Sequence, residues 1–317
     1  MTDSTRHLRA AALLLLAAAI WGFAFAAQRL GAQHVGTFTF NAIRFAMGAG
    51  LLGIVIAVLD RRRGWHAPRR RAATRAALVP GTVTGALLAV AAGLQQAALA
   101  ETTAGNAAFV TGLYMVLVPL AAVAHGKRVG LPTVTGIVAA VGGLYLISVT
   151  DTLRLHPGDG LVMLSAVGFA AQILLVDYYA GRLARLRFAA TQFLSCAVFS
   201  ALAALVWDAA PFAGLHLAIA PLVYTGILSV GVAYTLQVVA QRDAIATHAA
   251  LIMSMESVFG ALGGALFLGE NMGPRGYGGA ALMLTGIVVS QIGAAPRTPS
   301  GEPRASTHER TPRTAAS

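Results

Sequence analysis

Long apolar runs separated by short polar segments dominate the chain from Leu8 to Gly293. Ten of these runs come close to the length of about 20 residues at which an α-helix crosses the hydrocarbon core of a bilayer. They cover residues 8–28, 36–59, 76–98, 104–124, 131–149, 158–180, 188–207, 218–240, 247–268 and 274–293. The pattern predicts an all-α integral membrane protein with ten transmembrane helices.

The apolar pattern stops after the tenth run. Residues 294–317 read "AAPRTPSGEPRASTHERTPRTAAS" and are rich in Pro, Arg, Ser and Thr. Such a segment cannot bury enough apolar surface to fold, so we expect a disordered tail. The two groups of five helices, residues 8–149 and 158–293, are then the structured units.

Composition supports the membrane assignment. Of the 317 residues, 57% are hydrophobic and only 11% are charged, with a mean hydropathy of +0.71. Soluble proteins carry about 25% charged residues. The single cysteine, Cys196, can form no internal disulfide.

The net charge of +11 raises the question of nucleic-acid binding, but the placement of the charges favours another explanation. If the N-terminus lies inside, inside segments hold 19 of the 23 basic residues, with seven arginines between Arg61 and Arg75. Basic residues concentrate on the cytoplasmic side of membrane proteins and attract anionic lipids. We therefore expect both termini in the cytoplasm and no nucleic-acid partner.

The chain also repeats itself. One constant shift aligns the segment that follows the fourth run with the segment that follows the ninth, without gaps. The aligned glycines are Gly126 with Gly269, Gly130 with Gly273, Gly136 with Gly279 and Gly143 with Gly286. Because each half has five helices, the second half starts on the opposite side of the membrane. Inverted repeats of this kind are typical of secondary transporters, although an old duplication could also serve only as scaffold.

Arg44 and Glu256 are the two charges deep within apolar runs. Arg44 shares one helix face with Thr37, Asn41 and Gly48, so this face should point to the protein interior. Two interpretations stay open. Arg44 and Glu256 could form a structural ion pair, or Arg44 could bind a substrate carboxylate while Glu256 couples movement to protonation.

Further polar and aromatic residues could line the same cavity. We single out Trp21, Gln95, Asn106, Tyr114, Tyr234 and Gln237 beside Asn41, Arg44 and Glu256. Hydrogen bonding between helices is the alternative use of each of them. The sequence has no metal-ligand spacing, no G-x-S-x-G elbow and no Walker loop. We therefore expect no enzyme activity, cofactor or metal, and transport driven by a gradient of protons or of an exchanged solute.

Three segments resemble a known family. "AAIWGFAFAAQRLGAQHVGTFTFNAIRF", "GLQQAALAETTAGNAAFVTGLYMVLVPL" and "AYTLQVVAQRDAIATHAALIMSMESVFGALGGALFLGE" resemble the EamA-type transporters of the drug/metabolite transporter superfamily. One position departs from the family pattern, because Ser257 stands after Glu256 where the family usually has proline. The resemblance therefore does not imply a proline kink in this helix.

The resemblance implies a ten-helix carrier in the cytoplasmic membrane, usually an exporter of amino acids, metabolites or drug-like amphiphiles. A lipid scramblase or a membrane-embedded enzyme is the alternative. The inverted repeat disfavours both, and the lack of a nucleophile or metal set also disfavours the enzyme.

Overall fold

The computed structural model describes residues 3–126, 129–148, 157–241, 244–270 and 273–293, and the regular structure of these residues is helical throughout. The helices of the first half are α1 (Asp3–Ala32), α2 (Thr37–Arg62), α3 (Ala67–Ala98), α4 (Ala104–Gly112), α5 (Tyr114–Ala124) and α6 (Leu131–Ser148). Those of the second half are α7 (Pro157–Ala180), α8 (Arg185–Trp207), η1 (Leu215–Ala218), α9 (Ile219–Val223), η2 (Tyr224–Tyr234), α10 (Thr235–Ala240), α11 (Ala246–Met253), α12 (Glu256–Leu268) and α13 (Pro274–Gly293). Helices satisfy every interior backbone group within the segment, as a chain in lipid requires. The predicted all-α class is confirmed.

Eight stretches of the described chain are long and apolar enough to cross a membrane, so the protein is a multi-pass membrane protein. They are Thr5–Ala32, Thr37–Arg62, Ala67–Ala98, Ala107–Ala124, Gly160–Tyr179, Arg185–Trp207, Leu215–Ala240 and His248–Leu268. Each coincides with one predicted run. The other two predicted runs form α6 and α13. Over their described residues, these two helices do not meet the same criteria of length and hydropathy. Ten spans therefore stay a prediction.

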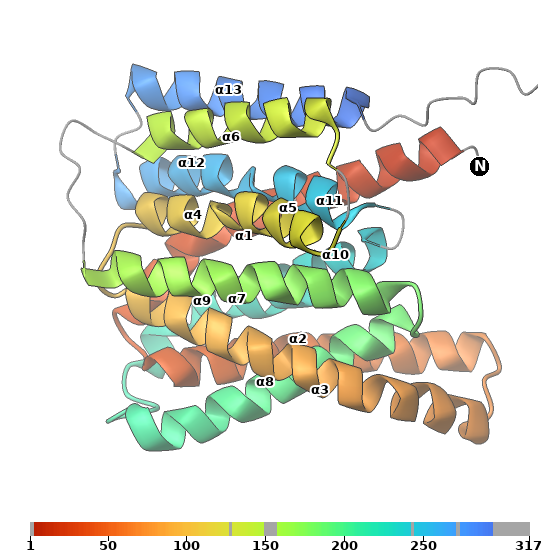
Figure 1. Cartoon of the computed structure of the whole chain (residues 1–317). Helices are drawn as coiled ribbons and strands as arrows, with labels where there is room; N and C mark the ends of the chain where they lie inside the picture. Colours follow the sequence, from red (N-terminus) through yellow and green to blue (C-terminus); the bar gives the residue numbers. More distant parts are fainter. Residues whose placement is uncertain (1–2, 127–128, 149–156, 242–243, 271–272, 294–317) are drawn as a thin grey trace, which may run out of the picture.

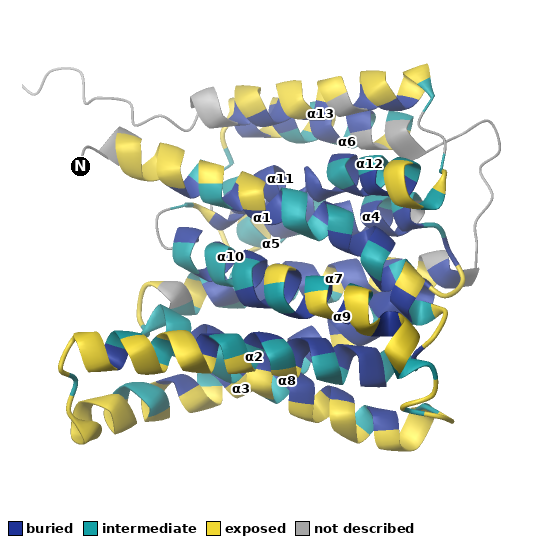
Figure 2. Ribbon diagram, turned by 180° about the vertical axis from the view of Figure 1, so that it is seen from behind, coloured by how far each residue is buried: buried dark blue, intermediate teal, exposed yellow. Residues whose placement is uncertain are grey.

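The helices lie side by side with their axes roughly aligned (Figure 1). Helices α6 and α13 pack against each other along one edge of this stack, and α2, α3 and α8 pack together at the opposite edge. The start of α1 and the α2–α3 and α7–α8 connections lie at the same end (Figure 1). Figure 2 shows that exposed residues gather on the outward faces of the helices. Large apolar side chains such as Leu205 and Val79 are among the exposed residues, as expected of a surface that faces lipid.

Two of the predicted spans are broken in the middle. One break separates α4 from α5 at Leu113, and the other separates α11 from α12 at Ser254 and Met255. The shift that aligns Gly126 with Gly269 carries residue 112 onto Met255, so both breaks fall at nearly the same place in their half. The second break forms although Ser257 replaces the proline of the family pattern, and the Ser257 hydroxyl donates to the carbonyl of Ala108 on α4 at 2.7 Å.

The contact between α6 and α13 depends on glycine. A Cβ atom at Gly136 would collide with the backbone of Gly286, and one at Gly143 would collide with the backbone of Gly279. The sequence repeat aligns Gly136 with Gly279 and Gly143 with Gly286. It therefore carries the Gly136–Gly286 contact onto the Gly143–Gly279 contact. Small residues let helix backbones approach closely in membranes, where dispersion drives association. These glycines therefore set the spacing of the pair.

Candidate functional site

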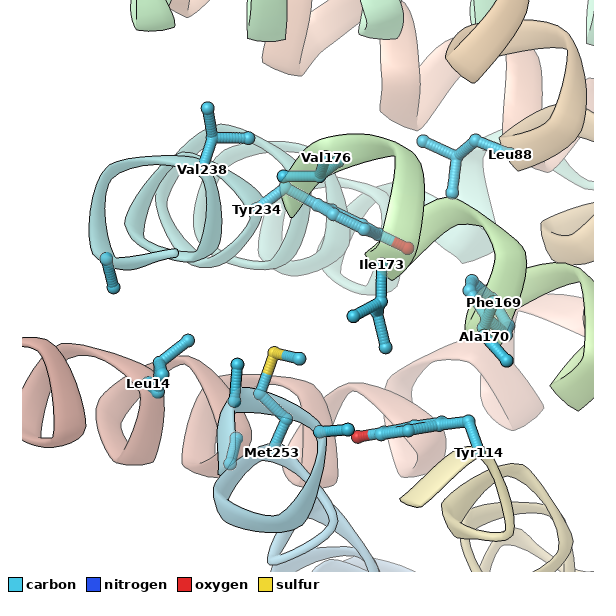
Figure 3. Packing of buried hydrophobic residues seen from close by; sticks show 14 of the residues in the cluster. Leu14, Leu88, Tyr114, Phe169, Ala170, Ile173, Val176, Tyr234, Val238 and Met253 are labelled. Atoms are coloured by element: carbon cyan, nitrogen blue, oxygen red, sulfur yellow. The ribbon is translucent and has the colours of Figure 1, made fainter. Parts of the chain in front are cut away.

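A small cavity lies at the centre of the helices, with walls from both halves of the chain. Its volume, counted for the centres of water molecules, is about 40 Å³. One water needs about 10–15 Å³ on this measure, so the cavity has room for a few waters in this conformation. Seven of the nine predicted site residues line it: Trp21, Arg44, Gln95, Tyr114, Tyr234, Gln237 and Glu256. In Figure 3, Tyr234, Ile173, Met253 and Tyr114 point into this region from four different elements.

Arg44 is the only arginine or lysine among the described residues of the lining. It is 3% exposed and donates from Nη1 to Oε1 of Gln28 on α1 at 2.6 Å. Its guanidinium carbon lies 4.9 Å from the ring centre of Phe45 and 5.8 Å from that of Phe40, within the range of cation–π attraction. Its Nε has no partner within the described part of the chain. The arginine is thus oriented by Gln28 and the two rings, with donor capacity left over.

Glu256 begins α12 and is 4% exposed. It lines the same cavity as Arg44, but within the described residues the two form no ion pair, since Arg44 bonds to Gln28 and Oε1 of Glu256 has no partner. Tyr114 lines the cavity beside Glu256, and its hydroxyl lies close to the carboxyl group. Of the two interpretations left open by the sequence, the structural ion pair is absent from this conformation.

Aromatic rings close one side of the cavity. Trp21 on α1 and Tyr234 at the end of η2 meet edge to face, with their ring centres 4.6 Å apart. The Trp21 indole donates to the Ser229 carbonyl at 3.2 Å. Ser229 belongs to the π-helical segment η2, and π-helical turns recur at functional sites. The wider turn brings both Ser229 and Tyr234 to the cavity wall.

Side-chain amides bond in a pattern that repeats between the halves. Gln96 on α3 donates to the carbonyl of Gln28 at 3.1 Å, and Gln241, directly after α10, donates to the carbonyl of Ile173 on α7 at 3.4 Å. Both bonds span 68 residues, and a shift of 145 residues (Gln96 to Gln241, Gln28 to Ile173) carries the first bond onto the second. This shift is two residues longer than the one that aligns Gly126 with Gly269. Gln95 donates to Thr111 at 3.0 Å.

The structure differs from the prediction at Asn41. Its side-chain amide donates to the Ala92 carbonyl on α3 at 3.0 Å, so this residue joins α2 to α3 and lies outside the cavity lining. The polar face of α2 is therefore shared between a helix contact and the cavity. Asn106 is part of α4, but its side chain lies outside the described part of the structure.

Three polar residues of the lining were not predicted from the sequence: Gln28, Gln172 and Ser229. Gln28 closes the first apolar run, and Gln172 lies inside the sixth, which is the first run of the second half. Their similar places in the two halves are a signal that could have identified them. Gln237 donates to Gln172 over a long 3.5 Å, which leaves Nε2 of Gln172 and Oε1 of Gln237 unpaired within the described chain.

The described residues contain no group of three or more His, Cys, Asp or Glu side chains that could hold a metal ion. The polar groups of the cavity are instead one guanidinium, one carboxyl, several amides and hydroxyls. Such a set can bind a small polar or charged solute through hydrogen bonds. Its apolar walls, from Phe25, Phe169, Ile173 and Met253, can contact the rest of that solute.

Comparison with known proteins decides the class. The model of the EamA-like transporter family matches residues 8–149 and again residues 156–291. The chain belongs to this family. The EamA-like protein is also similar to an uncharacterized transporter of Archaeoglobus fulgidus, with 27% identity over 291 residues, 92% of this chain and 88% of that one. It is thus a membrane transporter.

A solved structure shares the fold of this EamA-like protein. The two superpose with a TM-score of 0.71 at 19% identity, over 92% of this chain and 98% of the other, which is a crystal structure. At this identity the likeness concerns the fold alone.

Proposed function

We propose that this EamA-like transporter is a secondary-active exporter of small metabolites, amino acids or amphiphilic drugs, and that it works by alternating access across the cytoplasmic membrane. One observation carries the proposal: the central cavity is lined by both halves of the chain and contains one arginine and one glutamate that are buried deep within the spans. Ionisable residues inside a membrane are costly and mark substrate or ion pathways.

The proposal takes the chain as two inverted repeats of five spans each. Three features of the structure support it: the repeated glutamine hydrogen bond, the exchanged glycine contacts and the two broken helices at equivalent places. In inverted repeats the substrate site lies near the bilayer midplane between the halves, often at discontinuous helices. The breaks at Leu113 and Met255 directly adjoin the cavity residues Tyr114 and Glu256.

The proposed orientation follows from charge. The start of α1 and the α2–α3 and α7–α8 connections lie at one end of the molecule (Figure 1). These connections and the helix ends beside them carry Arg6, Arg9, the seven arginines from Arg61 to Arg75, and Arg182, Arg185 and Arg187. This end faces the cytoplasm by the positive-inside rule. Both termini are then cytoplasmic, and the tail of residues 294–317, which lies outside the described residues, is a cytoplasmic tail.

The geometry suggests a role for each charged residue. Arg44 attracts an anionic group of the solute, since its remaining donors match a carboxylate fork. Glu256 takes up a proton or the cationic part of a solute, since its Oε1 has no protein partner among the described residues. The cavity holds only a few waters, so it must widen toward one side to admit a solute and toward the other to release it. That is the sequence of states in alternating access.

Flux in liposomes tests this function. A thermal-shift screen of the purified protein against amino acids, nucleobases, sugars and cations first identifies a ligand, and reconstituted protein is then assayed for gradient-driven flux of that ligand. We expect flux by the wild type, loss of flux with Arg44→Ala, and impairment with Arg44→Lys, because a planar fork becomes a point charge. Arg275→Ala is the matched control, since Arg275 is exposed and lies outside the cavity. Lipid flipping without solute flux would contradict the proposal and favour a scramblase.

A further inference from the structure

A second and larger cavity lies at the arginine-rich end of the molecule. It has a volume of about 470 Å³ and is bounded by the last turns of α2, the first turn of α8, α10 and the α7–α8 connection. This volume is in the range of pockets that bind small molecules. None of its residues lines the central cavity, so it is a separate site.

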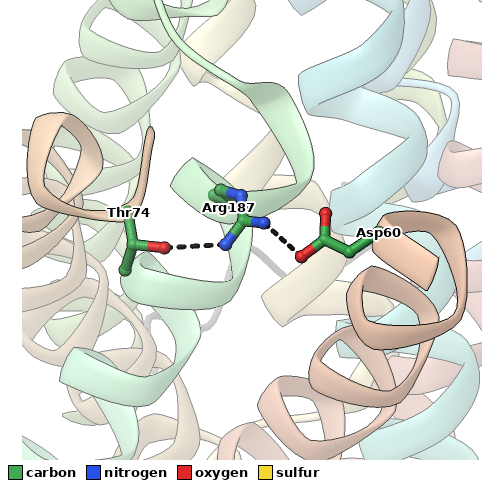
Figure 4. A network of polar contacts seen from close by, with 3 residues as sticks. All are labelled: Asp60, Thr74 and Arg187. Atoms are coloured by element: carbon green, nitrogen blue, oxygen red, sulfur yellow. Dashed lines mark hydrogen bonds and ion pairs between the residues drawn. The ribbon is translucent and has the colours of Figure 1, made fainter. Parts of the chain in front are cut away.

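The charge of this inner pocket is positive. Arg63, Arg185 and Arg187 line it together with a single acidic residue, Asp60. Arg187 is already engaged: it forms an ion pair with Asp60 and donates to the Thr74 hydroxyl at 2.7 Å (Figure 4). This network joins α2, α3 and α8 and neutralises one of the three arginines.

Most N–H donors of Arg63 and Arg185 make no hydrogen bond with the described residues. Arg185 makes one long hydrogen bond, from Nη1 to the Val239 carbonyl at 3.4 Å. The Arg63 side chain is exposed and has no hydrogen bond or ion pair with the described residues. Arginine side chains bind phosphate oxygens through paired, charge-assisted hydrogen bonds. The pocket therefore fits an anion with several oxygen acceptors, such as a phosphate group.

The surroundings of the pocket fit a lipid better than a soluble phosphate. Leu59, Leu183 and Val239 form part of its wall, and Trp65 stands at its edge with Arg187 over its ring at 5.5 Å. Tryptophan is enriched where membranes meet water. The preceding turns of α2 expose Ile54 and Val58, so a surface suited to acyl chains leads up to the arginines.

We propose that this inner pocket binds the phosphate headgroup of an anionic membrane lipid, with Arg63 and Arg185 as the principal donors. Basic pockets between transmembrane helices on the cytoplasmic side bind such headgroups. The lipid would bridge α2 and α8 next to the Asp60–Arg187 pair and so stabilise this end of the molecule.

Native mass spectrometry of the full chain in detergent tests the proposal. The probes are phosphatidylglycerol, phosphatidylcholine as a zwitterionic lipid, and free glycerol phosphate and inorganic phosphate. We expect retention of phosphatidylglycerol and a higher Tm in its presence, with neither effect from the other three. The double variant Arg63→Gln, Arg185→Gln should weaken this binding about tenfold to thirtyfold, since each arginine near an anionic headgroup contributes about fivefold.

The matched control is the double variant Arg70→Gln, Arg71→Gln. It removes the same charge from the same end of the molecule, but both side chains are exposed and lie outside the pocket. We expect it to retain phosphatidylglycerol as the wild type does. Equal weakening by both double variants would overturn the proposal in favour of general charge attraction. Binding of glycerol phosphate or inorganic phosphate in preference to the lipid would overturn it in favour of a soluble anion site.

Discussion

Replacing Gln28 by leucine tests whether the hydrogen bond that Arg44 donates to Gln28 stabilises the protein. Gln28 is 4% exposed, and its Oε1 accepts from Arg44 at 2.6 Å. Leucine has a similar size but no acceptor, so Nη1 of Arg44 is left without this bond inside the membrane. Hydrogen bonds to charged groups contribute about 1.5–3 kcal/mol. For a chain of this size we expect Tm to fall by about 3–10 °C.

Gln192→Leu provides the matched control on α8. Gln192 is fully buried, and both of its amide atoms lack a hydrogen-bond partner among the described residues. Replacing such a group by an apolar one of similar shape is close to neutral or stabilising. We therefore expect Tm to stay the same or to rise, in contrast to Gln28→Leu.

Gln28→Glu distinguishes the structural from the binding role of Arg44. A carboxylate at this place still accepts from Arg44 and should preserve Tm, but it neutralises the arginine that an anionic solute would need. We expect flux in liposomes to fall about tenfold or more, which corresponds to the loss of one charge-assisted hydrogen bond. The measurements are thermal unfolding of the purified variants and flux of the ligand found by the screen. A Gln28→Leu variant as stable as the wild type, or a Gln28→Glu variant with full flux of an anionic solute, would refute the reasoning.

Three further predictions follow from helix ends and topology. Ser257→Pro should still fold, because proline is tolerated in the first turn of α12. It should lose about 1–3 kcal/mol, because it removes the hydrogen bonds that the Ser257 N–H and hydroxyl donate to Ser254 and Ala108, and a collapse in expression would contradict this. Asp208→Ala should lower stability by about 1–2 kcal/mol and Asp208→Asn by less, as read from Tm, because this carboxylate accepts from the first turn of α2. In a Cys196→Ala background, an impermeant thiol reagent outside sealed cells should label Ala100→Cys and spare Arg69→Cys, and the reverse result would overturn the orientation.

The positions of the helices were predictable because lipid imposes one length and one polarity on every span. The eight spans of the structure coincide with predicted runs for that reason. The breaks at Leu113 and Met255 and the π-helical segment η2 were not predictable in this way. They change backbone hydrogen bonding, whereas the hydropathy that marks a span continues through them unchanged.

The candidate site was predictable at residues whose burial in the membrane costs much free energy. Arg44 and Glu256 stood out because a buried charge is expensive, and both line the cavity. Asn41 lies on the same face of α2 as Arg44 but donates a hydrogen bond to α3. A helix face that points to the protein interior can contact a neighbouring helix at one position and the cavity at another. Gln28 was missed because an amide at the end of an apolar run has an ordinary explanation at the membrane surface.

Two-sided labelling of a cavity residue tests the central claim most directly. Met253 lines the cavity and is fully buried, so Met253→Cys in a Cys196→Ala background places one thiol at the proposed substrate site. The reagent is applied to right-side-out and to inside-out membrane vesicles, with and without the ligand found by the screen. Alternating access predicts slow labelling from both sides, with protection by the ligand. Labelling from one side only, or from neither, would contradict the account.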